Sequence, residues 1–213
     1  SFNHAIYSEI KEVLAKNNIE QIDGALFDLG VSSMQLDLAE RGFSYARSAK
    51  LDMRMDQSRG ITAQEVLDTY EKPALVKVLR EYGEEKFAIR IADNIIKNRG
   101  KINDTQSLVE LIKESIPAPA RRTGGNPAKR TFQALRIEVN GELTAIEVAI
   151  PAALNALKVN GRVVVLSYQS LEDKIVKRIF ADFTKSNSLL GLPIELPNSK
   201  ASFQLITRGS ENA

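Results

Sequence analysis

The sequence predicts an α/β protein in which two strand-forming regions flank a long helical block. The first region centres on the uncharged run Ala25-Leu26-Phe27, and the second on Arg162–Tyr168, the clearest strand signal in the chain. Between them, residues 62–116 carry apolar side chains at helical spacing without a convincing strand. We therefore expect a sheet whose strands are separated in sequence by an inserted all-helical subdomain.

Composition narrows the class of protein. A chain of 213 residues can hold one large domain or a core with an insert, and 43% apolar with 26% charged residues is typical of globular proteins. No apolar run approaches the roughly 20 residues that span a bilayer, so we expect no membrane segment and a cytoplasmic location. The lack of cysteine excludes disulfides, thiolate catalysis and Cys-based zinc sites, and a single histidine, His4, cannot form a histidine metal cluster, so no metal site is predicted.

The first strand region ends in polar residues. A short amphipathic helix over residues 8–16 leads into the run 25–27, whose lack of charge is typical of a strand buried on both faces. The run stops at Asp28, and Gly30 and two serines follow, which favour a turn. Ligands of open parallel sheets bind beyond the carboxyl ends of the strands, so Asp28 stands where a cofactor or substrate would be held. The alternative is a capped loop in which Asp28 binds its own backbone.

Residues 36–56 are rich in charge. In Leu51–Asp56 apolar and charged residues alternate, which fits either an edge strand or a solvated loop. Its charged members, Asp52, Arg54 and Asp56, fit a structural ion network as well as they fit a contact with substrate, and the sequence does not separate the two.

The helical block is predicted as four helices. Thr62 and Glu65 have the spacing of a capping box, which marks the start of the first helix, and Pro73 suits the first turn of the second. The third helix ends near Gly100, and Pro117 closes the fourth.

The most basic stretch is residues 117–136, which contain no acidic residue. The formal net charge of +2 is too small to indicate a polyanionic partner, so any nucleic-acid contact has to rest on such a local cluster. Its cations suit phosphate contacts beside a glycine-containing backbone, and the alternative is a solvated surface loop. The cations are Arg121, Arg122, Lys129, Arg130 and Arg136.

A second strand region follows two further helices. The second of these helices covers residues 142–157, where Pro151 is expected to kink or break it. The strand 162–168 then leads into Ser170–Asp173, a pattern that caps a helix. Two strand ends with polar groups, facing one crevice, favour a ligand site. Phe203–Thr207 is predicted as a final strand.

Six motifs, in order and correctly spaced over nearly the whole chain, closely resemble the bacterial RsmH (MraW) ribosomal RNA methyltransferases. They are Asp23–Ser33, Gln35–Asp37, Glu40–Tyr45, Leu51–Asp56, Asn126–Ile137 and Ser167–Asp173. The resemblance implies transfer of a methyl group from S-adenosylmethionine to the N4 amine of a cytosine in 16S rRNA, near the decoding centre of the small ribosomal subunit. It also implies a Rossmann-like methyltransferase sheet with a helical insertion, and it allows for a homodimer. We accordingly expect a core at 1–46 and 126–213 and a helical insertion with a basic loop at 47–125.

The resemblance also assigns site residues. By position, Asp28 and Gln35 look like cofactor contacts, and Tyr7 lies near the place of an aromatic residue against the adenine, although simple packing explains Tyr7 equally well. Arg121, Arg122, Lys129 and Arg130 are expected on the RNA side. For the chemistry we expect Asp28, Ser32 or Ser33 to supply hydrogen-bond acceptors around the amine, and the alternative for Asp28 is that it serves the cofactor instead.

Departures from the family pattern keep alternatives open. The glycine-rich Gly-Gly-Gly-His loop and the ribose-binding acid of the family have no counterpart in this sequence, and Tyr168-Gln169-Ser170 replaces Phe-His-Ser, which argues against a catalytic imidazole there. The main alternative is an RNA-binding module without catalysis. A nicotinamide-dependent Rossmann enzyme is disfavoured because no G-x-G-x-x-G motif follows a strand.

Overall fold

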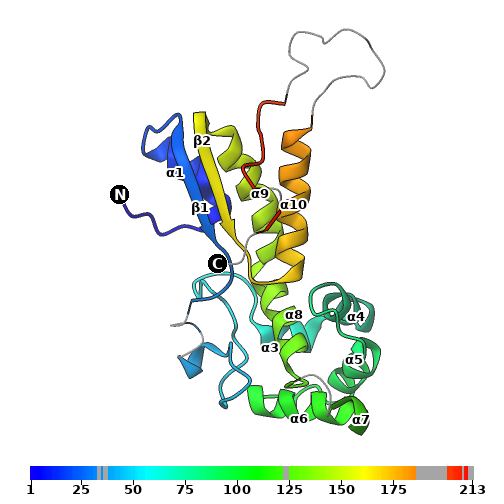
Figure 1. Ribbon diagram of the computed structural model, residues 1–213. Coiled ribbons are helices and arrows are strands. Elements are labelled where there is room, and N and C mark those ends of the chain that lie inside the picture. Colours follow the sequence, from blue (N-terminus) through cyan, green and yellow to red (C-terminus); the bar gives the residue numbers. More distant parts are fainter. Residues whose placement is uncertain (33–34, 36–37, 122–124, 186–200, 208, 211–213) are drawn as a thin grey trace. The chain divides into compact units, whose positions relative to one another are not determined.

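The computed structural model groups the chain into two units (Figure 1). It describes residues 1–32, 35, 38–121, 125–185, 201–207 and 209–210. Unit 1 comprises Ser1–Gly30 and Leu143–Ala213, and unit 2 comprises Val31–Glu142. The residues of unit 2 thus lie in sequence between the two parts of unit 1.

Unit 1 contains a parallel pair of strands. β1 (Ile22–Asp28) pairs with β2 (Leu157–Leu166), in a register that sets Ala25 opposite Val163 and Asp28 opposite Leu166. The pairing confirms an α/β protein with a parallel sheet. Parallel neighbours need a long crossover connection, and the whole of unit 2 lies within this connection.

Helices cover one face of this sheet (Figure 1). They are α1 (Ile10–Lys16), preceded by the 3-10 turn η1 (Tyr7–Glu9), then α9 (Glu142–Asn155) and α10 (Ser170–Thr184). Phe27 packs in a core with Ile150, Val176 and their neighbours from α9 and α10. Helix α9 continues through Pro151, so the expected break at this residue is wrong.

The expectation that the first strand is buried on both faces is wrong. Phe27 retains 6% of its exposure, but its neighbour Leu26 retains 69%, and Val164, opposite Leu26 in register, retains 50%. Successive side chains of a strand point to opposite faces. Residues 25, 27, 163 and 165 face the helices, and the described residues leave the other face open.

The predicted final strand is also wrong. Residues 203–207 pair with no strand among those the structure describes. Phe203 instead packs edge-on against Phe183 of α10, with ring centroids 5.5 Å apart, while Leu205 and Ile206 are exposed. Of the apolar residues in this segment, Phe203 therefore packs on a helix, while the other two remain exposed.

Unit 2 is helical, with a 3-10 turn η2 (Ala39–Arg41) near its start. The four predicted helices are present, and Thr62 and Glu65 form the expected capping box, with the Glu65 N–H donating to Thr62 Oγ1 at 3.1 Å. A short helix and a longer one follow them. The helices are α3 (Ala63–Thr69), α4 (Lys72–Glu81), α5 (Ala88–Lys97), α6 (Thr105–Ser115), α7 (Ala118–Arg121) and α8 (Lys129–Asn140).

Helix α8 belongs with the helical unit. Its residues Phe132 and Leu135 are buried in the core formed with α3 to α6. The close approach requires Gly83 after α4, because a Cβ there would come within 2.6 Å of the Arg130 carbonyl oxygen. The unit boundaries therefore fall at 30/31 and 142/143, and differ from the expected 46/47 and 125/126.

The segment Leu51–Asp56 is an ordered loop and forms no edge strand. Leu51 and Met53 are buried, which explains the alternation in the sequence. Asn140 of α8 holds the loop, since its Nδ2 donates to the Met53 carbonyl at 2.8 Å and its Oδ1 accepts from the Met55 N–H at 2.7 Å. Among the helices of the described residues, none has the length and apolar character that a membrane crossing requires.

Candidate functional site

The carboxyl ends of β1 and β2 lie at the same edge of the sheet. Asp28 and Leu166, the last residues of the two strands, are partners in register, and the Leu29 N–H donates to the Leu166 carbonyl at 3.0 Å. The Asp28 side chain is exposed at this edge. The first strand end and the polar residues after the second are therefore adjacent, which is the arrangement expected for a ligand site of a parallel sheet.

A direct hydrogen bond joins the two strand ends. The Tyr168 hydroxyl donates to Asp28 Oδ1 at 3.0 Å. Hydrogen bonding to this carboxylate, together with its negative charge, raises the pKa of the Tyr168 hydroxyl, because ionisation would break the bond and place two anions side by side. The alternative reading, in which Asp28 caps its own backbone, has no support among the hydrogen bonds of the described residues.

Tyr168 is also fixed through its main chain. Its N–H donates to Glu172 Oε2 at 3.0 Å, and the Gln169 N–H donates to the same oxygen at 3.2 Å. Glu172 lies in the first turn of α10 and is 2% exposed. Helix α10 begins where the sequence predicts, but the capping pair is Gln169 and Glu172, one position before the expected Ser170 and Asp173. Glu172 anchors the residue that reaches Asp28.

Gly30 lets the chain turn away after β1. Its φ of +95° lies in the left-handed region that side-chain-bearing residues rarely adopt. A Cβ at this position would stand 3.9 Å from Cδ2 of Tyr168. Gly30 therefore lies next to the tyrosine ring and presents backbone to it.

Tyr7 packs on the residue before Asp28. Its ring meets that of Phe27 edge to face, with centroids 6.2 Å apart, and Tyr7 retains 37% exposure. The packing that the sequence analysis weighed for Tyr7 is present, and the remaining exposure leaves part of the ring accessible to a ligand.

Ser32 and Gln35 lie in unit 2 and bond to each other. The Ser32 N–H donates to Gln35 Oε1 at 3.0 Å, and the Gln35 N–H donates to Ser32 Oγ at 3.3 Å. These reciprocal bonds close one tight turn of the backbone. Ser33, predicted beside them as an acceptor, lies outside the described residues.

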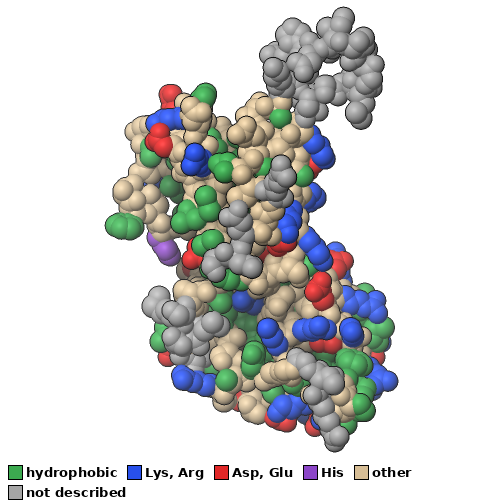
Figure 2. All heavy atoms as spheres, in the orientation of Figure 1, with side chains coloured by type: hydrophobic (Ala, Val, Ile, Leu, Met, Phe, Trp, Pro, Cys, Tyr) green, Lys and Arg blue, Asp and Glu red, His purple; other side chains and the backbone are tan. Residues whose placement is uncertain are grey.

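The predicted RNA-side cations differ in what they contact. Lys129 and Arg130 are exposed in the first turn of α8, and Arg121 is exposed at the end of α7. Arg130 Nη1 donates to the Glu84 carbonyl at 3.2 Å. Arg122 lies outside the described residues. On the face drawn in Figure 2, Lys and Arg side chains are spread over unit 2 with acidic side chains between them.

Arg136, the last cation of the basic stretch, serves the fold. Its Nε and Nη2 donate to the two carboxylate oxygens of Glu142 at 2.8 and 2.9 Å, and the side chains are only 14% and 6% exposed. Its charge is thus already satisfied by a carboxylate.

The charged loop 51–56 is likewise explained by structure. Arg54 Nε donates to Asp52 Oδ1 at 2.7 Å, and this bond lowers the pKa of Asp52. Asp56 accepts from the Ser58 hydroxyl at 2.6 Å and pairs with Arg59 at 2.9 Å. The structural ion network is the reading that these contacts favour.

The sequence identifies Tyr168 only as a departure from a family pattern and does not predict its contact with Asp28. The signal that identifies it is the parallel register, because a residue two positions beyond Leu166 must lie near the end of β1 once the two strands pair.

Comparisons with known proteins show the family of this chain. The profile of the MraW methylase family matches residues 1–213. Similar proteins named ribosomal RNA small subunit methyltransferase H occur in Salinispora tropica (57% identical over 98% of this chain and 57% of that protein), Mycolicibacterium smegmatis (57%, over 97% and 56%) and Saccharopolyspora erythraea (57%, over 99% and 64%). The chain spans somewhat more than half the length of these relatives. It belongs to the MraW methylase family.

Proposed function

We propose that this chain acts in S-adenosylmethionine-dependent methylation of small-subunit ribosomal RNA, with the N4 amine of a cytosine in 16S rRNA as the acceptor. The observation that carries the proposal is the exposed Asp28 carboxylate at the shared carboxyl end of two parallel strands, hydrogen-bonded to Tyr168. Family membership and the names of the relatives support the reaction class. The parallel pair followed by α10 is in keeping with part of a Rossmann-like methyltransferase sheet.

The residues at this edge fit S-adenosylmethionine. A carboxylate accepts hydrogen bonds from ribose hydroxyls and from the ammonium of the methionine end, and Tyr168 engages one Asp28 oxygen, so that the other is available among the contacts of the described residues. Asp28, Gln35 and the exposed part of Tyr7 are the residues we assign to the cofactor. When bound, the cofactor supplies an electrophilic methyl group on a positively charged sulfur.

The protein has to make the acceptor amine more nucleophilic. The lone pair of a cytosine N4 is delocalised into the ring, so the amine is a weak nucleophile until acceptors hold its N–H groups. We assign this role to Asp28, Ser32 and Ser33, which would also stabilise the positive charge that develops on nitrogen. A proton of the amine becomes acidic only after the nitrogen has attacked the methyl group, so the reaction does not require a strong base. Alignment of the reacting atoms is therefore the larger contribution to the rate. The target base has to be unpaired or flipped out to reach the site.

Cations of unit 2 are assigned to the RNA backbone. Lys129, Arg130 and Arg121 are exposed, and Arg122 adjoins them in sequence. Each phosphate that such a cation neutralises adds affinity that falls with salt concentration. Arg136 is excluded from this set because Glu142 already engages it.

The reaction is tested by methyl transfer from labelled S-adenosylmethionine to small ribosomal subunits that lack the modification, with N4-methylcytosine identified by mass spectrometry of the digested RNA. We expect label in that nucleoside. RNA binding without label transfer or cofactor binding would favour an RNA-binding module without catalysis. Alanine at Ser32 or Ser33 should slow single-turnover transfer, and unchanged rates would remove the hydroxyls from the mechanism.

A further inference from the structure

Tyr168 combines two properties that seldom occur together on a protein surface. Its side chain is 70% exposed, and yet both of its ends are fixed. The hydroxyl is held by Asp28 at 3.0 Å and the main-chain N–H by Glu172 at 3.0 Å. A single exposed aromatic residue is ordinary, but an exposed ring whose rotation is already restricted binds a flat ligand with less loss of conformational entropy.

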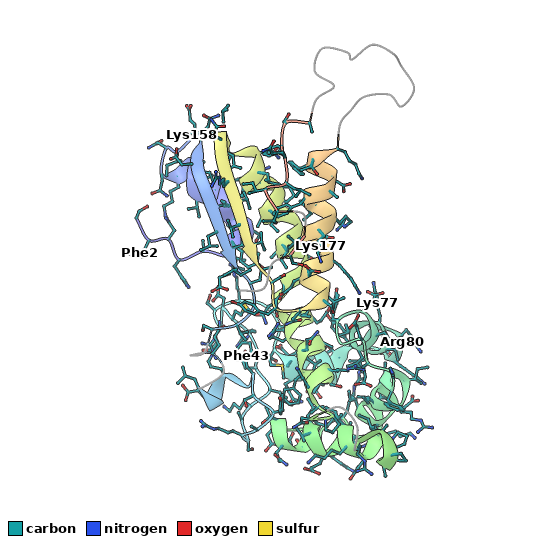
Figure 3. The ribbon with its side chains drawn as sticks, viewed as in Figure 1. Phe2, Phe43, Lys77, Arg80, Lys158 and Lys177 are labelled. Carbon is teal, nitrogen blue, oxygen red and sulfur yellow. The ribbon has the colours of Figure 1, made fainter. Side chains whose placement is uncertain are left out.

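The neighbours of the ring leave it accessible. Gly30, the residue that approaches Tyr168 Cδ2, has no side chain to cover it. Phe2 offers a contrast, since it is more exposed still, lies in the amino-terminal segment (Figure 3) and has no ring partner among the described aromatic pairs. The ring of Tyr168 is therefore both exposed and held in place at the candidate site.

We propose that the Tyr168 ring is a stacking surface for a nucleobase at the strand ends, positioned by the hydroxyl contact with Asp28, a role that rests on the proposed function. Aromatic faces stack on every base because each base has a π-face, and such contacts tolerate different sequences. The base has two sources in the proposed reaction, namely the adenine of the cofactor and a base of the RNA. Both present the same planar heterocycle to the ring.

The test compares three variants of the chain with two probes. The variants are Tyr168→Ala, Tyr168→Phe and, as a matched control, Phe2→Ala. The probes are S-adenosylhomocysteine, which carries adenine, and a short single-stranded oligocytidine. Binding is followed by tyrosine fluorescence and calorimetry, because the chain has no tryptophan to mask its five tyrosines.

We expect Tyr168→Ala to raise the Kd of one probe by roughly tenfold or more, which is the effect of losing one stacking contact. Tyr168→Phe keeps the ring and should restore most of that affinity, whereas a role in merely tying the strands together would be lost equally in both variants. Phe2→Ala should leave both Kd values unchanged. The affected probe identifies the source of the base.

Two outcomes separate this role from the proposed function. If the unchanged chain binds a probe and Tyr168→Ala binds it equally well, the stacking surface is wrong and the proposed function stands. If the unchanged chain binds neither probe, both are wrong. Should Tyr168→Ala fail to fold, fluorine NMR of the fluorotyrosine-labelled chain decides, since the resonance that Tyr168→Phe removes must shift when the bound probe stacks on it, and an unmoved resonance would overturn the role.

Discussion

Replacing Arg136 with methionine should destabilise the chain without weakening its binding to RNA. Arg136 and Glu142 form a two-point ion pair with side chains 14% and 6% exposed, so the variant removes both guanidinium hydrogen bonds from a carboxylate that is almost fully buried. Breaking a buried pair costs about 3–5 kcal/mol, and because Arg136 keeps some contact with water we expect about 2–4 kcal/mol. In urea unfolding this corresponds to a midpoint lowered by about 1 M.

Arg130 supplies the matched control. It is exposed in the first turn of the same helix and its contact is one hydrogen bond, at 3.2 Å, to the Glu84 carbonyl. Arg130→Met should change the free energy of unfolding by no more than about 0.5 kcal/mol. If Arg130 contacts a phosphate, the variant should reduce the slope of log K against log salt for single-stranded RNA by about 0.7.

A second pair of substitutions completes this test. Methionine at both Arg136 and Glu142 also removes the buried carboxylate, so it should recover part of the stability lost in the single variant. The reasoning is refuted if Arg136→Met costs less than about 1 kcal/mol, or if it lowers the salt slope as Arg130→Met does. Either result would indicate that Arg136 belongs with the cations proposed to bind RNA.

Two further predictions concern unit 2. Asn140→Ala should cost about 2–3 kcal/mol in thermal or urea unfolding, because it leaves two loop backbone groups without partners, and a cost below about 1 kcal/mol would contradict the clamp. Hydrogen bonding to Glu138 raises the pKa of Tyr70 from 10.0 to about 12, so its contribution to stability is fully present below pH 10 and is lost as the pH rises through about 12. Spectrophotometric titration of Glu138→Gln should show one tyrosine ionising near its ordinary pKa, and an unchanged titration would exclude this cause.

Local chemistry made much of the fold predictable. The capping box of Thr62 and Glu65 follows from short-range hydrogen bonding that the sequence spacing encodes directly. The run ending at Asp28 is a strand, and the helical block has its expected helices. These elements need no knowledge of distant residues.

Exposure and domain boundaries depend on partners that spacing does not reveal. An uncharged run such as Ala25-Leu26-Phe27 is compatible with a strand in a sheet covered on one face or on both. Leu26 is exposed because the described helices cover one face of the sheet. Helix α8 looks like the start of the core in sequence, but its apolar face packs on α4, as the tight approach at Gly83 shows. The segment 203–207 has strand-forming residues and no strand partner in the part of the chain described.

The sequence predicts the placement of Asp28 but not the contact that it makes. Asp28 was identified from its place at a strand end, and its exposure beside the end of β2 agrees with that reasoning. The contact between Asp28 and Tyr168 joins residues 140 positions apart and depends on the register of two strands, which no local pattern encodes. Likewise, Arg130 and Arg136 are equivalent as charges in the sequence, and only the fold separates an exposed cation from one bound to Glu142.

The most direct test of the central claim is the affinity for labelled S-adenosylmethionine of the unchanged chain, Asp28→Asn and Asp23→Asn. Asp23 lies near the opposite end of β1, where it pairs with Lys158 at 3.0 Å (Figure 3), so its substitution changes the same charge on the same strand away from the candidate site. Losing hydrogen bonds to a charged group should weaken binding by roughly tenfold or more in Asp28→Asn, and Asp23→Asn should bind as the unchanged chain does. Equal affinity of all three would contradict the assignment of the cofactor to this edge of the sheet.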